Sequence, residues 1–198
     1  MRNDRLQYIL KICFLVAIEA IFCFTPLGSV PIGPIVATLS AVPVIIASLT
    51  FGAYAGMFLG FVFGLFSFIV WTFVMPAHPM AFIFTPFGEF TEYKGNVGSL
   101  IICFLPRILV GLTPALTMKL LHGNESVSHM VIASVIGSLT NTVLVLTFIA
   151  LFFGREYSTI MGMGILTILG TTVLTNGIPE AIVAGIVCPL VSRIIKKI

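Results

Sequence analysis

The chain has 198 residues, of which 59% are apolar and 9% are charged, and its mean hydropathy is +1.17. Soluble domains are normally about one-quarter charged, and a soluble fold this short would leave much of its apolar surface in water. The composition therefore excludes an ordinary soluble domain and indicates an integral membrane protein. The net charge of +3 is too small to indicate nucleic acid as a partner.

The apolar segments predict a single membrane domain over residues 1–198. One crossing of the hydrocarbon needs about 20 apolar residues, so the chain has room for about six. The expected helices are 7–24, 35–51, 54–75, 99–121, 129–153 and 163–195. The sequence thus predicts an all-α, compact six-helix bundle, in which hydrogen bonds within each helix satisfy the backbone in lipid.

The first apolar segment begins like a secretion signal, with Arg2 and Arg5 before it. Lys11 and Glu19 interrupt the segment, however, and no small-residue cleavage site follows it. We therefore expect a first helix that is retained.

Basic residues concentrate on one side of the predicted bundle. With the N-terminus inside, the cytoplasmic side carries Arg2, Arg5, Lys11, Lys119, Arg193, Lys196 and Lys197, whereas the outer side carries Lys94 and Arg155. Because short cytoplasmic connections are enriched in Lys and Arg, both termini are predicted to be cytoplasmic. The loops 25–34, 76–98 and 154–162 then face outward.

The outer segment 76–98, "PAHPMAFIFTPFGEFTEYKGNVG", is long and rich in aromatic residues. A segment of this length without a clear helical pattern is unusual unless it acts as a lid or a binding loop. We expect a lid that packs over a bound small molecule and excludes water. An aromatic belt at the membrane interface is the alternative.

Several polar residues lie inside the predicted helices. From the helical rise, Arg107, Asn141 and Asn176 lie about 12, 18 and 20 Å below the outer ends of their helices. A buried cation costs at least about 2.5–3.5 kcal/mol in a membrane, so such residues usually face the bundle interior or water. We therefore expect them to line one cavity that opens outward. Thr142 follows Asn141, and Glu180 shares a helix face with Asn176.

A purely structural role is the alternative for two of these residues. Glu19 lies about 8 Å below the outer end of the first helix, which is close to the depth of Arg107. The two side chains could form an ion pair with no part in ligand binding. Asn141 could equally form a hydrogen bond between helices.

Glycines recur every four residues at the start of the third predicted helix, at Gly52, Gly56, Gly60 and Gly64. Small residues at this spacing let a second helix approach closely. The helix that packs against these glycines could belong to the bundle or to a partner subunit.

Motifs for catalysis or metal binding are missing from the sequence. There is no P-loop, the three histidines have no metal-ligand spacing, and the four cysteines lie in or beside apolar runs. We therefore expect no metal, no cofactor and no enzymatic activity. A membrane-embedded enzyme is the alternative class.

Residues 24–68, together with "PRILVG" (106–111), "GSLTNTVLVL" (137–146) and "TNGIPEAIV" (175–183), resemble the S components of energy-coupling-factor (ECF) vitamin transporters. They look most like the pantothenate-specific members. The resemblance implies a multi-pass protein of the bacterial plasma membrane that captures a vitamin from outside. It also implies association with a transmembrane coupling subunit, EcfT, and two ATP-binding subunits. These partners use the ATP and drive toppling of the S component.

The resemblance suggests roles for the polar residues. Arg107 would pair with the pantothenate carboxylate in a bidentate geometry. Asn141, Thr142 and Asn176 would meet its hydroxyls and amide. Glu180 lies deeper and is a weaker candidate.

Two aromatic residues, Trp71 and Phe84, would cover the apolar gem-dimethyl part of the vitamin. The ligand could instead be folate, riboflavin, or a pyridoxine or thiamine precursor. In this family the coupling subunit usually contacts small residues of the first helix, often Ala-x-x-x-Ala. The nearest match here is Cys13-x-x-x-Ala17, with Ala20 close by.

Overall fold

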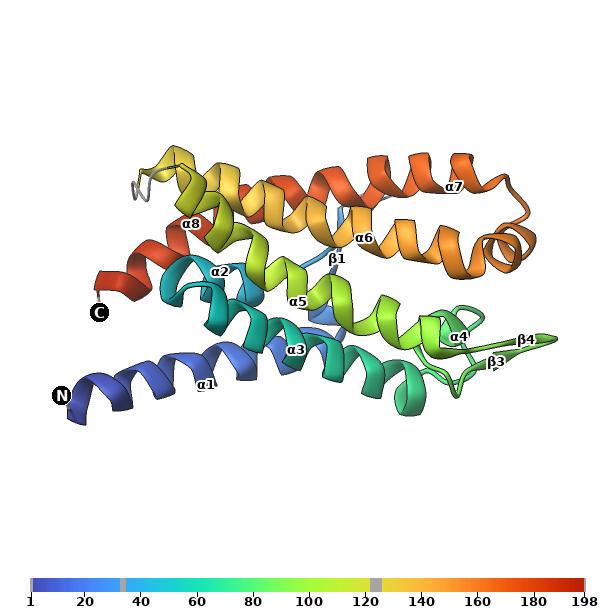
Figure 1. Cartoon of the computed structure of the whole chain (residues 1–198), viewed down its shortest axis with the longest axis horizontal. Coiled ribbons are helices and arrows are strands. Elements are labelled where there is room, and N and C mark those ends of the chain that lie inside the picture. Colours follow the sequence, from blue (N-terminus) through green and yellow to red (C-terminus); the bar gives the residue numbers. More distant parts are fainter. Residues whose placement is uncertain (1, 33–34, 122–125, 198) are drawn as a thin grey trace.

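The helices lie side by side along one long axis in the computed structural model, which describes residues 2–32, 35–121 and 126–197 (Figure 1). Helix α1 begins and helix α8 ends at the same end of this bundle, and α4, β3 and β4 lie at the opposite end. This arrangement agrees with termini on one side of a membrane. The cytoplasmic location of that side stays a prediction.

Among the described residues, five helical segments are long and apolar enough to cross a membrane. They are α1 (Arg2–Phe24), α3 (Ala53–Ile69) with the π-helix η2 (Val70–Val74), α5 (Val97–Leu120), α6 (Val127–Met161), and α7 (Ile165–Thr172) with the π-helix η3 (Val173–Gly177) and α8 (Ile178–Lys197). The predicted all-α membrane architecture is therefore confirmed.

The second predicted helix, 35–51, starts too early. Residues Ile35–Thr38 form strand β2, which pairs antiparallel with β1 (Ser29–Ile32) after the 3₁₀ turn η1 (Pro26–Gly28). Only α2 (Val42–Phe51) is helical, and its ten residues are too few to cross a membrane. A short apolar run does not distinguish strand from helix by periodicity, and "IVAT" is rich in β-branched residues, which favour strands.

The fifth predicted helix, 129–153, ends too early. Helix α6 continues to Met161 through a bend at Phe153, where φ is −137° and ψ is 23°. The segment 154–162, which was predicted to be an outer loop, is therefore mostly helical. Gly162, with a φ of 65°, ends helix α6. The bend brings the buried Phe153 ring into edge-on contact with Phe82, with the ring centroids 5.3 Å apart.

Residues 76–98, which we name the lid segment after the role predicted for them, are folded, and that role stays a prediction. They contain α4 (Ala81–Phe84) and the short pair β3 (Glu89–Phe90) and β4 (Tyr93–Lys94). Phe82 is fully buried, and its carbonyl accepts a 2.6 Å hydrogen bond from the Ser99 hydroxyl at the start of α5. The lid segment is thus anchored to α5 and α6.

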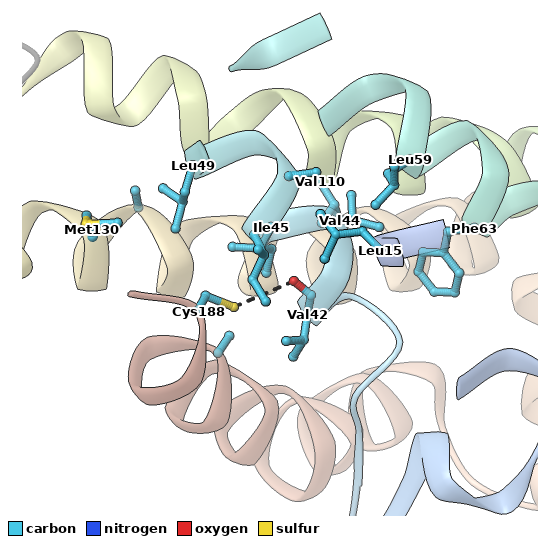
Figure 2. Close-up of a cluster of buried hydrophobic side chains, with 14 residues drawn as sticks. Leu15, Val42, Val44, Ile45, Leu49, Leu59, Phe63, Val110, Met130 and Cys188 are labelled. Atoms are coloured by element: carbon cyan, nitrogen blue, oxygen red, sulfur yellow. Dashed lines mark hydrogen bonds between the residues drawn. The ribbon is translucent and has the colours of Figure 1, made fainter. Parts of the chain in front are cut away.

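Helix α2 lies at the centre of the hydrophobic core. Its residues 42–49 are all buried, as expected for a helix that is apolar on every side. In Figure 2, Val44 and Ile45 lie among side chains from other elements, including Leu15, Val110 and Met130. The core therefore holds α1, α3, α5, α6 and α8 around α2.

Candidate ligand-binding cavity

A cavity of about 500 Å³ lies between the end of α1, the α3–η2 segment, α5 and α6. Small-molecule sites commonly have this size. Its walls are formed by Phe22, Cys23, Phe24, Thr25, Pro26, Ser40, Phe63, Ser67, Val70, Trp71, Val74, Met75, Arg107 and Asn141. The structure thus brings Arg107 and Asn141, from two different helices, to one cavity.

Arg107 is buried, with 7% of its surface exposed. Its Nη1 donates a hydrogen bond to the backbone carbonyl of Ile102, whereas its Nε has no hydrogen-bond partner. Leaving a buried donor unpaired costs about 1–3 kcal/mol, and more when the group is charged. A ligand that supplies an acceptor would remove this cost.

Asn141 presents the complementary kind of atom. Its Oδ1 is a buried acceptor without a hydrogen-bond partner, and the side chain lines the same cavity. Buried polar atoms without partners are rare in folded proteins and call for an explanation. Together, Arg107 and Asn141 suit a ligand that carries both an anionic acceptor and a donor.

Glu19 does not pair with Arg107. It is fully buried in α1, where Oε1 accepts a hydrogen bond from the Cys23 thiol at 3.4 Å and Oε2 has no partner. The structural ion pair that competed with a ligand role for Arg107 is therefore not formed.

The glycine stripe of α3 fixes the position of Arg107. A β-carbon at Gly60 would overlap the backbone carbonyl of Arg107, and one at Gly56 would overlap that of Gly111. Helix α5 is therefore the helix that docks on the stripe. Gly52 has a different role, because its φ of 89° makes the tight reversal between α2 and α3.

The two predicted aromatic residues lie next to each other but differ in position. Trp71 lines the cavity, and its ring stacks on Phe84 with centroids 4.9 Å apart at an angle of 18°. Phe84 is not on the cavity wall; its ring lies 5.4 Å from the Arg107 guanidinium carbon. A 2.8 Å hydrogen bond from Thr72 to Thr85 ties the same two segments together.

Three other predicted residues do not line the cavity. Thr142 is buried between helices, where its side chain faces Gly177. Asn176 lies in η3, which packs beside β2. Glu180 lies in α8, near enough for its charge to act on Arg107. Of the polar cluster expected on α6 and α8, Asn141 is the member that reaches the cavity.

Sequence reasoning missed several cavity residues, notably Cys23, Ser40, Phe63 and Ser67. Ser67 is a polar residue on an apolar helix, so it could have been noticed. No sequence signal marked the π-helical turns of η2 and η3. In η2 the Met75 N–H donates to the Val70 carbonyl at 2.8 Å, five residues back. Such turns are frequent at functional sites.

The residues predicted to contact a partner lie on the face of α1 that points away from the rest of the bundle. Cys13 and Ala17 are exposed and Ala20 is half-buried. Cys13 lines an apolar groove between α1 and α3, with Tyr8, Ile9, Ile12, Val16, Tyr54, Ala55 and Phe58. This face is apolar and suits either lipid or another membrane helix.

Residues 7–192 match the family described as "ECF transporter, substrate-specific component". The chain belongs to this family. A curated relative, the pantothenic acid transporter PanT of Lactococcus lactis subsp. cremoris (strain MG1363), is 38% identical over 165 residues, which are 83% of this chain and 80% of the relative. In fold, the chain is similar to a solved S component of a bacterial ECF transporter. That likeness has a TM-score of 0.53 and 21% identity and covers 100% of this chain and 95% of the solved one.

The family defines the general activity of this S component. S components bind a vitamin substrate and work with energy-coupling modules. Because the family and the curated relative are transporter components, the chain is not an enzyme. Its apolar helices and its family make it a multi-pass protein of the bacterial cell membrane.

Proposed function

We propose that this S component binds pantothenate and that Arg107 recognises the vitamin's carboxylate. The observation that carries the proposal is a buried arginine on the cavity wall whose Nε has no hydrogen-bond partner among the described residues. Arginine binds carboxylates through two parallel hydrogen bonds, which are short and strong. The 38% identity to a pantothenic acid transporter supports the choice of vitamin.

The other parts of pantothenate have matching groups in the cavity. Asn141 Oδ1 can accept a hydrogen bond from a hydroxyl or from the amide N–H. Trp71 offers an apolar surface for the gem-dimethyl group. Three of the predicted residues do not line the cavity and would support the site indirectly: Thr142, Asn176 and Glu180.

We further propose that the bundle end with the lid segment faces outward and that both termini are cytoplasmic. The S component then delivers the vitamin by toppling against a transmembrane coupling subunit, EcfT. Two ATP-binding subunits use ATP to drive this movement. The exposed small residues Cys13 and Ala17, with Ala20, would form the contact. Their apolar, small-residue face suits close helix packing in lipid.

Calorimetry on the purified chain in nanodiscs tests the choice of ligand. Pantothenate should bind at least about 100-fold more tightly than riboflavin, folate, thiamine or pyridoxine, a difference of about 2.7 kcal/mol. Tighter binding of any of the other four would identify a different vitamin and contradict the proposal.

Co-purification tests the partner surface. Ala17→Trp should abolish co-purification with the coupling subunit and the ATP-binding subunits, because the bulky ring blocks close approach. Leu190→Trp, at an exposed position of α8, is the matched control and should co-purify normally. Pantothenate binding should survive both substitutions. Normal assembly of Ala17→Trp would show that this face of α1 is not the contact.

A further inference from the structure

Two aromatic rings from distant parts of the chain lie next to the Arg107 guanidinium. Its central carbon lies 5.5 Å from the ring centroid of Phe63, in α3, and 5.4 Å from that of Phe84, in α4. Phe63 is 7% exposed, and Phe84 is half-buried. We name Phe63 and Phe84 the aromatic clamp.

The clamp restrains a cation that forms one hydrogen bond within the described residues. A guanidinium near an aromatic ring is attracted by the ring's electron-rich face, most strongly when both are shielded from water. The Ile102 carbonyl accepts a hydrogen bond from Nη1 and adds a third restraint. Rings and carbonyl together restrict the guanidinium and leave Nε unpartnered.

The clamp also has a fixed support. The Phe84 ring stacks on Trp71, which lines the cavity, and the neighbouring Thr85 accepts a hydrogen bond from Thr72. Phe84 itself is not on the cavity wall. Phe84 therefore lies behind the wall, beside two residues that form it, Arg107 and Trp71.

We infer that Phe63 and Phe84 are positioning residues that hold the Arg107 guanidinium ready for the carboxylate of the ligand. The inference rests on the proposed function of this cavity. It gives the lid segment a specific task, because α4 supplies one of the two rings. A preorganised arginine binds a carboxylate without first having to be ordered, which increases affinity.

The test compares pantothenate with pantothenol, in which a neutral hydroxymethyl group replaces the carboxylate. In Phe84→Leu, pantothenate affinity should fall about 10- to 30-fold and pantothenol affinity by a clearly smaller factor, since both ligands would meet Trp71 but only the carboxylate would meet Arg107. Phe63→Leu should lower pantothenate affinity more than pantothenol affinity. Phe84→Tyr keeps the aromatic face and should restore binding.

Phe87→Leu is the matched control, because Phe87 lies in the same lid segment and is 73% exposed. It should bind both ligands as the unsubstituted chain does. Equal losses for both ligands in Phe84→Leu would show a merely structural role and overturn the inference, as would no loss at all.

An NMR measurement without ligand separates this inference from the proposed function. The Arg107 Nε–H resonance should shift in Phe84→Leu, since a neighbouring ring is lost, and should stay in place in Phe87→Leu. An unmoved resonance in Phe84→Leu would overturn the clamp. If the unsubstituted chain fails to bind pantothenate, the proposed function is wrong. The shift of the Arg107 Nε–H resonance still decides whether the clamp exists.

Discussion

Gly60 of α3 lies directly against the backbone carbonyl of Arg107 in α5, so that no β-carbon fits between them. The contact explains why a membrane helix that could have been uniformly bulky carries small residues on one face. It also links helix packing to ligand binding, because the arginine it positions is the one charged side chain on the cavity wall among the described residues.

Substitution of Gly60 should therefore lower the stability of the protein. Gly60→Ala forces α3 and α5 apart and should lower the free energy of unfolding by about 1–3 kcal/mol. Gly170→Ala is the control, because a β-carbon there would meet nothing within 4 Å and the glycine lies inside helix α7. It should stabilise the helix by up to about 1 kcal/mol. Thermal unfolding in detergent measures the stability of both variants. Equal stability of Gly60→Ala and Gly170→Ala would contradict the close contact.

The lid segment should depend on Phe82 for its order. Phe82→Ala removes a fully buried ring that contacts Phe153, at a cost of about 3–5 kcal/mol. Hydrogen exchange of the amides of residues 81–95 should accelerate in this variant. Phe87→Ala, at an exposed position of the same segment, should leave the exchange unchanged. Slow exchange in Phe82→Ala would mean that other contacts hold the lid segment in place.

Glu19 should be replaceable by glutamine without loss of stability. Its side chain is fully buried, accepts a hydrogen bond from a thiol and pairs with no arginine whose side chain the structure describes. An isolated buried carboxylate is costly, so an amide of the same shape should keep or raise the melting temperature. Pantothenate affinity should also persist. A fall in melting temperature by several degrees would show that the carboxylate has a charged partner.

Cys23 offers a direct view of cavity occupancy. Cys23 lines the cavity, whereas Cys103 and Cys188 are fully buried. In a Cys13→Ala background, a small methanethiosulfonate should modify Cys23 slowly in the free protein, because the partly buried thiol donates a hydrogen bond to Glu19 Oε1 and only the thiolate reacts. Pantothenate at 100 times its Kd should slow the reaction about 100-fold, since only the free fraction reacts. A rate that pantothenate leaves unchanged would place the ligand elsewhere.

Sequence patterns predicted the parts of the fold that depend on hydrophobicity. Long apolar runs predicted the membrane helices, and the predicted end of the first helix at residue 24 is the end of α1. The strand at Ile35–Thr38 was not predicted, because a short apolar run is compatible with either a strand or a helix. The continuation of α6 to Met161 escaped because it depends on Phe153 packing against Phe82, a contact between distant residues.

The cavity was predicted in part. Charge inside a membrane marked Arg107, and Asn141 stood out in an apolar helix. Depth along a helix does not fix the direction of a side chain, however, and Thr142 faces Gly177 instead of the cavity. The place of Phe84 beside Arg107 depends on how the lid segment folds back, which no local pattern encodes.

The most direct test of the central role of Arg107 is calorimetry of pantothenate and pantothenol with the unsubstituted chain and with Arg107→Gln. The unsubstituted chain should prefer pantothenate by at least about 100-fold, because the buried arginine is left unpaired by the neutral analogue. Arg107→Gln should bind pantothenol as before, which shows an intact fold, and should lose the preference. A variant that still prefers pantothenate by the original factor would contradict the recognition of the carboxylate by Arg107.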